Sequence, residues 1–199
     1  FNPECRYINA IINYDQDIAE EISSSENRIN AQELKIDNDC ENIIALHAPV
    51  AVDLRFILSA RKINHALEHI ADIAESVAKY VADHDVPYDK EIMTKTRINE
   101  MLDIFNAMMD CVVEAFENED PIIARKVFKK DKLINKINSD SPQIIIDNIN
   151  NYDKNMLLYL LSSIRKIERA ADSLKKIAEE IIYHLEAKVV KHEKKGNNL

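Results

Sequence analysis

Apolar residues recur at every third or fourth position over most of the chain, which is the spacing of one face of an α-helix. The first clear run covers residues 16–46 and the second covers residues 50–81. Pro49 separates the two runs and suits the first turn of a new helix. We therefore expect two long helices joined by a short connection in the first half of the chain.

The second half continues the same pattern after a break at DHDVPYD, a stretch of Asp, His and Pro without an apolar period. The next predicted helix runs from about Asp89 to Phe116. The segment ENEDP then predicts a turn, with Asp120 as the N-cap of a helix that begins at Pro121. The helix that begins at Pro121 is predicted to extend as far as the next segment that contains a proline.

That segment is DSPQ, residues 140–143, which we expect to end or interrupt the helix, because proline removes a helical hydrogen bond. The last helix is predicted from about Lys154 to Lys191. The pattern alone therefore predicts an all-α protein.

The chain also repeats itself at an offset of 100 residues. KINHALEHIADIAESVAK (62–79) matches SIRKIERAADSLKKIAE (163–179), so that Glu68 corresponds to Glu168 and Asp72 to Asp172. The preceding helices also match, with ENRIN resembling DKLIN. Repetition of this kind indicates two copies of one helical unit.

Three helices per copy, joined by short connections, predict two tandem three-helix bundles. We place the first in residues 1–85, with its first helix truncated, and the second in residues 86–199. The chain opens FNPECRYINA, with neither a signal peptide nor an initiator Met, so we expect it to begin inside a longer protein's first helix.

Composition supports helices and narrows the function. The 199 residues include one glycine and no tryptophan, which argues against tight hairpins and glycine-rich phosphate loops. A net charge of −9 argues against a nucleic-acid partner. Three widely spaced cysteines favour free thiols in a reducing cytoplasm. No apolar run reaches the ~18 residues that a membrane span needs.

The stretch HALEHIAD carries the most chemistry. On a helix, His65, Glu68, His69, Asp72 and Ser76 lie within about 100° of arc. Two carboxylates spaced i, i+4 can share a hard cation, and two imidazoles extend the choice of metal to iron, zinc or nickel. The plainer alternative is a solvated helix face. The opposite face is apolar and predicted to be buried: Ile63, Leu67, Ile70 and Ala74.

The second copy has the corresponding stripe on its last helix, where Arg165, Arg169 and Lys176 accompany Glu168 and Asp172. Three cations beside two anions make that stripe self-neutralised, so we expect the first copy to bind metal better. Neighbouring helices supply weaker candidate ligands, for which surface polarity is the alternative: Glu26, Asn30, Asp131 and Asn135, together with the acidic pair Glu33 and Asp37.

The segment AL-x-x-PVA-x-DLR-x-IL (45–58), followed by KI-x-x-x-LE-x-I-x-D (62–72), resembles the PhoU family of phosphate-uptake regulators. NAQELKIDNDCENIIAL (30–46) and KIERAADSLKKIAEEIIYHLEAKVVKH (166–192) resemble the same family. The resemblance implies two three-helix bundles, paired as a cytoplasmic homodimer without catalytic residues. It also implies restraint of the phosphate-starvation response through contacts with the phosphate ABC transporter, through its ATPase subunit, and with a membrane sensor histidine kinase.

The resemblance further implies that some members carry metal ions, including iron clusters, on their E-x-x-x-D helix motifs. Magnesium, iron, zinc and nickel all remain open here. Two departures weigh against metal loading. The family usually has Gly before each motif Asp, where this chain has Ala71 and Ala171, and often Asn four residues after it, where this chain has Ser76 and Lys176.

Three alternatives remain at this point. Similar repeats occur as cytoplasmic modules of sodium–phosphate cotransporters. H-x-x-E-H, formed by His65, Glu68 and His69, is a signature of one class of zinc peptidases, although the second copy has arginines in place of the histidines. A helical scaffold whose metal motifs have decayed is the third alternative.

Overall fold

The computed structural model describes residues 16–83 and 87–190, with the side chains of 27–78 and 87–190 placed. Within these ranges the chain is all helical, which confirms the predicted fold class. The helices are α2 (Gln16–His47), α3 (Val52–Asp83), α4 (Lys90–Thr96), α5 (Ile98–Glu117), α6 (Pro121–Asn148) and α7 (Lys154–Glu186).

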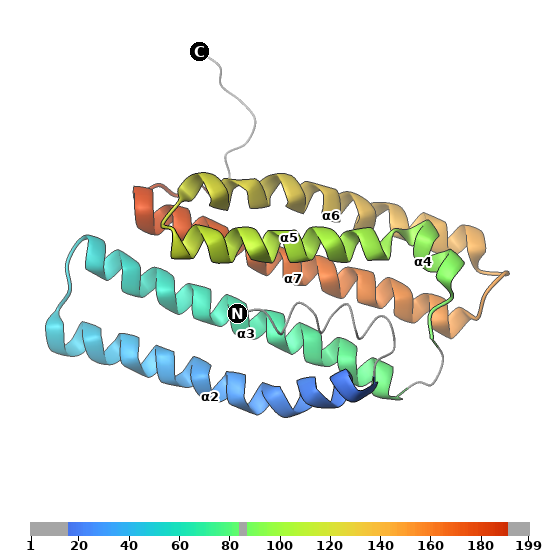
Figure 1. Cartoon of the computed structure of the whole chain (residues 1–199), viewed down its shortest axis with the longest axis horizontal. Helices are drawn as coiled ribbons and strands as arrows, with labels where there is room; N and C mark the ends of the chain where they lie inside the picture. Colours follow the sequence, from blue (N-terminus) through green and yellow to red (C-terminus); the bar gives the residue numbers. More distant parts are fainter. Residues whose placement is uncertain (1–15, 84–86, 191–199) are drawn as a thin grey trace, which may run out of the picture.

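The long helices lie side by side, with α3 and α7 in the middle of the molecule (Figure 1). Helix α2 packs on α3, and α5 and α6 pack on α7 and on each other. The second half of the chain is therefore a three-helix bundle preceded by the short α4. In the first half the structure describes the α2–α3 pair, and the predicted truncated helix lies outside the described residues.

The core of the bundle comes from apolar positions that share one face of each helix. Met101, Phe105 and Met108 of α5 are fully buried, and Ile134 of α6 and Leu160 of α7 meet them there. Helix α3 contributes through the face that the sequence predicted: Ile70 and Ala74 are buried in the same cluster, and Ile63 and Leu67 pack against it half-buried.

Helices α3 and α7 are joined by polar contacts as well. Lys62 Nζ lies 3.0 Å from Glu180 Oε1, and Lys166 Nζ donates to the carbonyl of Ser76 at 2.9 Å. Residue numbers rise along α3 as they fall along α7, so the two helices run antiparallel. This interface is where the repeats meet, and it brings residues 90 and 118 positions apart into contact.

The prediction of one continuous helix from Asp89 to Phe116 is wrong in one respect. The structure has two helices there, α4 and α5, separated at Arg97. Arg97 has φ 60°, in the left-handed region, and its N–H donates to the carbonyls of Met93 and Thr94. A left-handed backbone is costly for a residue with a Cβ. Thr96 and Ile98 are both buried on either side of the break, and that burial offsets the cost.

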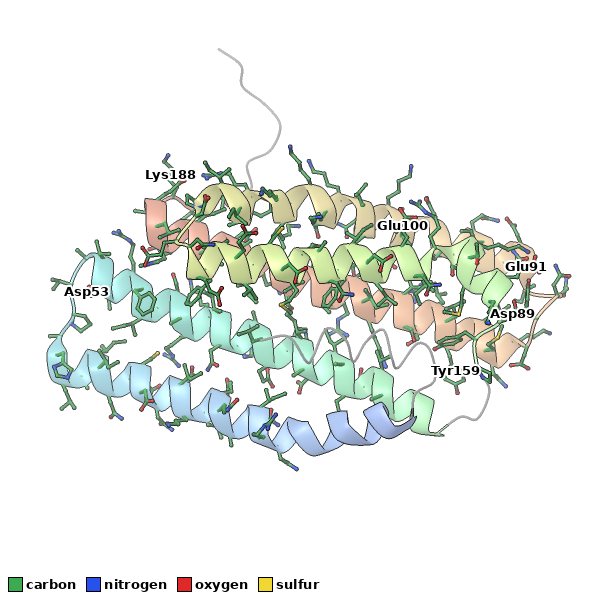
Figure 2. All side chains as sticks on the ribbon, in the orientation of Figure 1. Asp53, Asp89, Glu91, Glu100, Tyr159 and Lys188 are labelled. Atoms are coloured by element: carbon green, nitrogen blue, oxygen red, sulfur yellow. The ribbon has the colours of Figure 1, made fainter. Side chains whose placement is uncertain are left out.

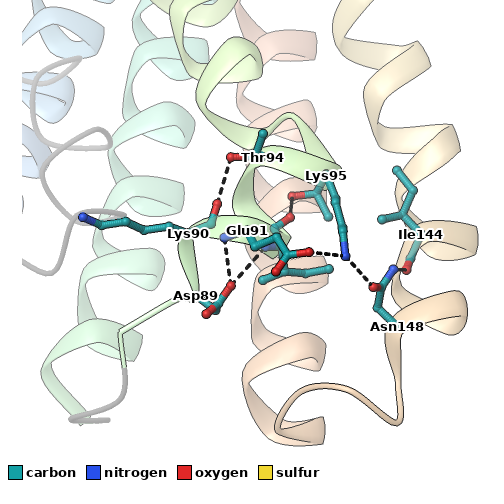
Figure 3. A network of polar contacts seen from close by, with 9 residues as sticks. Asp89, Lys90, Glu91, Thr94, Lys95, Ile144 and Asn148 are labelled. Carbon is teal, nitrogen blue, oxygen red and sulfur yellow. Dashed lines mark hydrogen bonds and ion pairs between the residues drawn. The ribbon is translucent and has the colours of Figure 1, made fainter.

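Polar contacts hold α4 at the end of the bundle where α6 ends (Figure 3). Asp89 caps the helix by accepting from the backbone N–H of Glu91 at 2.8 Å. Lys95 contacts Glu91 Oε1 at 2.7 Å and donates to Asn148 Oδ1 of α6 at 3.0 Å. In Figure 2, Asp89, Glu91 and Tyr159 lie at this end, whereas Asp53 and Lys188 lie at the other.

The predicted start of helix α6 is confirmed, but the prediction that the helix ends or is interrupted at residues 140–143 is wrong. Asp120 accepts from the N–H groups of the first turn, with Pro121 just behind it. The helix then passes through Pro142 without ending. Ile137 and Ile145, on either side of the proline, are 1% and 5% exposed, so tertiary packing stabilises the turn that the proline weakens.

Helix α7 ends at Glu186 rather than near Lys191. Ala187 follows in the left-handed conformation with φ 55°, and its N–H donates to the carbonyl of Tyr183. Ala48 and Glu119 also have positive φ at helix ends. Glycine is the usual residue at such positions, and this chain has a single glycine.

Candidate acidic stripes and the cleft beside them

The first stripe lies on α3, where Glu68, His69 and Asp72 are half-buried and His65 is exposed. The side chain of Glu68 is 23% exposed, whereas that of His65 is 78% exposed. His65 Nδ1 lies 3.7 Å from Glu68 Oε2. His69 and Asp72 continue the stripe and are also half-buried. The neighbours that cover the stripe come from α2 and α7.

The carboxyl groups of this stripe crowd one another. Burial raises the pKa of Glu68, and the negative charges of Asp72 and of Glu33 on α2 raise it further, while His65 opposes them. A raised carboxyl pKa means that the ionised form is less favourable here than in water, in the case of Glu68 first because of burial and then because of neighbouring carboxylates. A cation placed between Glu68 and Asp72 would offset the repulsion between the two carboxylates, so their chemistry suits a cation.

His69 shows that the two stripes are neighbours. Burial lowers its pKa, and the positive charges of Arg169 and Lys176 on α7 lower it further, against the opposing effect of Asp72. Two cations that the sequence assigned to the second stripe therefore act on the first one. Packing of α3 against α7 produces this proximity, which helical periodicity does not predict.

A cleft of about 490 Å³ lies beside the first stripe, between α2, α3 and α7. Most of its charges are paired within the protein. Arg61 contacts Asp37 at 3.0 Å and Glu41 at 3.5 Å, and Lys62 contacts Glu180. Its polar lining comprises Glu33, Asp37, Arg61, Lys62, His65, His69, Ser173, Lys176 and Glu180.

Asp37, one of the weaker acidic candidates, is engaged in packing α2 on α3. The hydrogen bond from Arg61 holds the pKa of Asp37 below its usual value. Asn64 lies beside it and donates to the carbonyl of Glu33 at 2.9 Å and to Asp37 Oδ1 at 3.4 Å. The carboxylate of Asp37 is therefore satisfied by protein donors.

The second stripe differs because α6 adds a buried acid to it. Asp131 is 4% exposed, and its Oδ2 accepts from Lys175 Nζ at 3.0 Å and from Asn135 Nδ2 at 3.2 Å. Lys175 also lies 3.8 Å from Asp172 Oδ1. Burial raises the pKa of Glu168, and the charges of Asp172 and Asp131 raise it further.

Lys175 is a charged neighbour of the second stripe that the sequence did not point to. It lies outside the arc of the stripe, although its i, i+3 spacing from Asp172 was a usable signal. Asn30 is half-buried on α2, and the side chain of Glu26 lies outside the described ones. Among the residues that the structure describes, no three His, Cys, Asp or Glu side chains form a group that could hold a metal ion.

These features define an all-α protein of two related helical units, with acidic stripes at matching positions. The PhoU domain model matches residues 6–81 and 98–181, one match in each half of the chain. The chain therefore belongs to the PhoU family.

Named relatives agree with this assignment. A phosphate-specific transport system accessory protein PhoU homolog of Aquifex aeolicus is 29% identical over 77% of this chain and 64% of its own length. The homolog of Borreliella burgdorferi is 30% identical over 85% of this chain and 79% of its own length. The chain thus spans just under two thirds of the first relative and more than three quarters of the second.

Two crystal structures share the fold. PhoU from Pseudomonas aeruginosa has a TM-score of 0.81 at 24% identity, covering 93% of this chain and 90% of its own. The phosphate transport system regulatory protein PhoU from Streptococcus pneumoniae has the same TM-score and identity, covering 94% and 88%. None of the helices that the structure describes is both long and apolar enough to cross a membrane.

Proposed function

We propose that this chain is a non-enzymatic accessory protein of phosphate uptake that also restrains the phosphate-starvation response. The observation that carries the proposal is the family match in both halves of the chain, at corresponding places in its repeat. The relatives from Aquifex aeolicus and Borreliella burgdorferi are named as accessory proteins of phosphate-specific transport.

The partners that we propose are the ATPase subunit of a phosphate ABC transporter and a sensor histidine kinase. The protein would act in the cytoplasm as a homodimer and reach the membrane through these partners. The family resemblance supports this assignment. The net charge of −9 also disfavours nucleic acid as a competing partner.

The metal part of the proposal concerns the first stripe. Glu68 and Asp72 would hold the ion, and it would neutralise a crowded carboxylate pair. His65 and His69 would be further ligands only after turning toward it, because no three such side chains of the described residues form a group that could hold a metal ion. The raised pKa of Glu68 supports this placement. Iron, zinc, nickel and magnesium remain the candidates. Glu168 and Asp172 are the corresponding pair of the second stripe, and we propose it as the weaker one.

A complementation experiment tests the regulatory role. A bacterium that lacks its own PhoU is given this chain, and a phosphate-starvation reporter is measured in phosphate-rich medium. Repression of the reporter is expected, together with recovery of the transporter's ATPase subunit in a pull-down. A Phe105→Asp variant, which places a charge in the buried core, serves as the unfolded control. Full reporter activity with a folded, expressed chain, and no recovered subunit, would refute the proposal.

The remaining alternatives are separated by other measurements. A cotransporter module requires transmembrane segments in the same gene. The peptidase alternative requires zinc-dependent hydrolysis that is lost in Glu68→Gln. The decayed scaffold requires that protein purified without chelator contains no metal.

A further inference from the structure

The buried acid of the second repeat already has a cation of its own. Lys175 Nζ donates to Asp131 Oδ2 at 3.0 Å and lies 3.8 Å from Asp172 Oδ1. It therefore bridges a carboxylate of α6 and one of α7. The side chain of Asp131 is 5% exposed and that of Lys175 is 33% exposed, so solvent screens this contact only partly.

The position of Lys175 has the opposite charge in the first repeat. At the offset of 100 residues its counterpart is Glu75, whereas the acidic pair itself is kept as Glu68 and Asp72. The first repeat therefore has no lysine at the position of the bridging cation. The two stripes have the same acids but different sources of positive charge.

The local electrostatics agree with this arrangement. Burial is the largest single effect on Lys175 and lowers its pKa, but the hydrogen bond to Asp131 and the negative charges of Asp131, Asp172 and Glu179 together outweigh it, so the pKa of Lys175 is raised. Asp131 Oδ1 is buried and has no hydrogen-bond partner among the described residues. The Lys175 ammonium therefore supplies positive charge to the Asp131 carboxylate, which is otherwise only partly satisfied by hydrogen bonds.

We infer that Lys175 is the resident cation of the second acidic cluster, formed by Asp131, Glu168 and Asp172. As these described side chains lie around Lys175 they form no group that could hold a metal ion, and its charge keeps a divalent ion from drawing them together. A divalent ion binds carboxylate oxygens at about 2.0–2.6 Å. An ion bound to Asp131 and Asp172 would therefore lie against the ammonium, and their repulsion opposes binding. This inference concerns the ion chemistry of the chain and holds whether or not the regulatory function does.

The test measures Mn²⁺ binding, because the cluster offers only oxygen ligands. The first stripe is removed in a Glu68→Gln/Asp72→Asn chain, and bound Mn²⁺ is measured by titration and by metal analysis. With Lys175 present, we expect no Mn²⁺ that depends on Glu168 and Asp172. Adding Lys175→Met should create one such ion, which Glu168→Gln/Asp172→Asn then removes.

Stability provides a second, metal-free readout. In chelator, Lys175→Met should lower Tm by about 5 °C, because it leaves a buried carboxylate without its cation. Asp131→Asn added to Lys175→Met should recover most of that loss. If Lys175→Met does not fold, Lys175→Gln keeps an amide donor on Asp131 without the charge and replaces it in both measurements.

Lys176→Met is the matched control, since Lys176 is the adjacent cation but lines the cleft beside His69. It should create no Mn²⁺ site at the second cluster. Two results would overturn the inference. One is an Mn²⁺ ion held by Glu168 and Asp172 while Lys175 is intact. The other is the absence of any gain in Mn²⁺ binding once the Lys175 charge is removed.

Discussion

Lys62 of α3 and Glu180 of α7 form an ion pair that joins the two repeats. The ammonium contacts both carboxylate oxygens, at 3.0 and 3.1 Å, and Ser59 Oγ lies 3.4 Å from one of them. The Glu180 side chain is 9% exposed, whereas Lys62 is 57% exposed. The pair therefore supplies positive charge to a carboxylate that the interface buries.

Lys62→Met should destabilise the protein by about 1–2 kcal/mol, because it leaves the Glu180 carboxylate buried without its cation. Thermal or urea unfolding measures the change. Lys95→Met is the control, since the Lys95–Glu91 pair is exposed on both sides and its loss should change stability less. Equal losses from the two variants would contradict a special role for the interface pair.

Metal content should depend on the first stripe. Glu68→Gln/Asp72→Asn should remove most of the metal from protein purified without chelator, because it removes the carboxylate pair that lacks a built-in cation. Glu168→Gln/Asp172→Asn should remove none, because Lys175 already occupies that cluster, and metal analysis of both proteins measures the difference. Equal loss from the two variants would contradict the ranking of the stripes.

Acid should weaken the contact between α2 and α3. Because the pKa of Asp37 is lowered in the folded state, its contribution to stability is present above its ordinary value of 3.8 and is lost as pH falls through the lowered value. At neutral pH, Asp37→Asn should lower Tm by about 2 °C, and the difference from the unmodified protein should shrink below pH ~4.

Asp39→Asn, on the same helix and exposed, is the control for this acid titration. Melting curves from pH 3 to pH 7 measure both variants. A difference between Asp37→Asn and the unmodified protein that stays constant with pH would contradict the assignment of the shift to the Arg61 contact.

Glycine in place of Ala187, the residue that follows α7, should make the protein more stable. Ala187 has φ 55°, where a Cβ costs about 1 kcal/mol and glycine has no such penalty. Ala187→Gly should therefore raise the free energy of unfolding, by up to ~1 kcal/mol. Ala45→Gly, in an exposed helical position of α2, should lower it by a similar amount. Chemical denaturation of both variants measures the contrast.

Apolar periodicity predicted most of the fold, because an isolated amphipathic face already shows which side of a helix is buried. Helices α2 and α3 have close to their predicted ranges, and the Asp120 cap begins α6 as expected. The errors lie where packing outweighs local preference. Arg97 breaks a run that looked continuous, and Pro142 fails to break one, since buried residues flank both positions.

The candidate site was predicted only in part, because helical spacing shows which residues share one face of a helix but not which residues of other helices face them. Spacing along one helix placed Glu68 and Asp72 on one stripe, and Glu168 and Asp172 on the other. Spacing could not show that Lys175 reaches Asp131 on another helix, or that Arg169 and Lys176 act on His69. Both relationships depend on how α7 is rotated against α6 and α3.

The sequence by itself determined that this protein is helical, repeated and a carrier of two acidic motifs, because these properties are periodic along one chain. The tertiary structure alone decided which positive charge each motif meets. Residues that are far apart in the sequence can lie close together in the fold. Packing brings Lys175 to Asp131, 44 residues away, and Lys62 to Glu180, 118 residues away. The two motifs therefore share their Glu and Asp pair and differ in their cations.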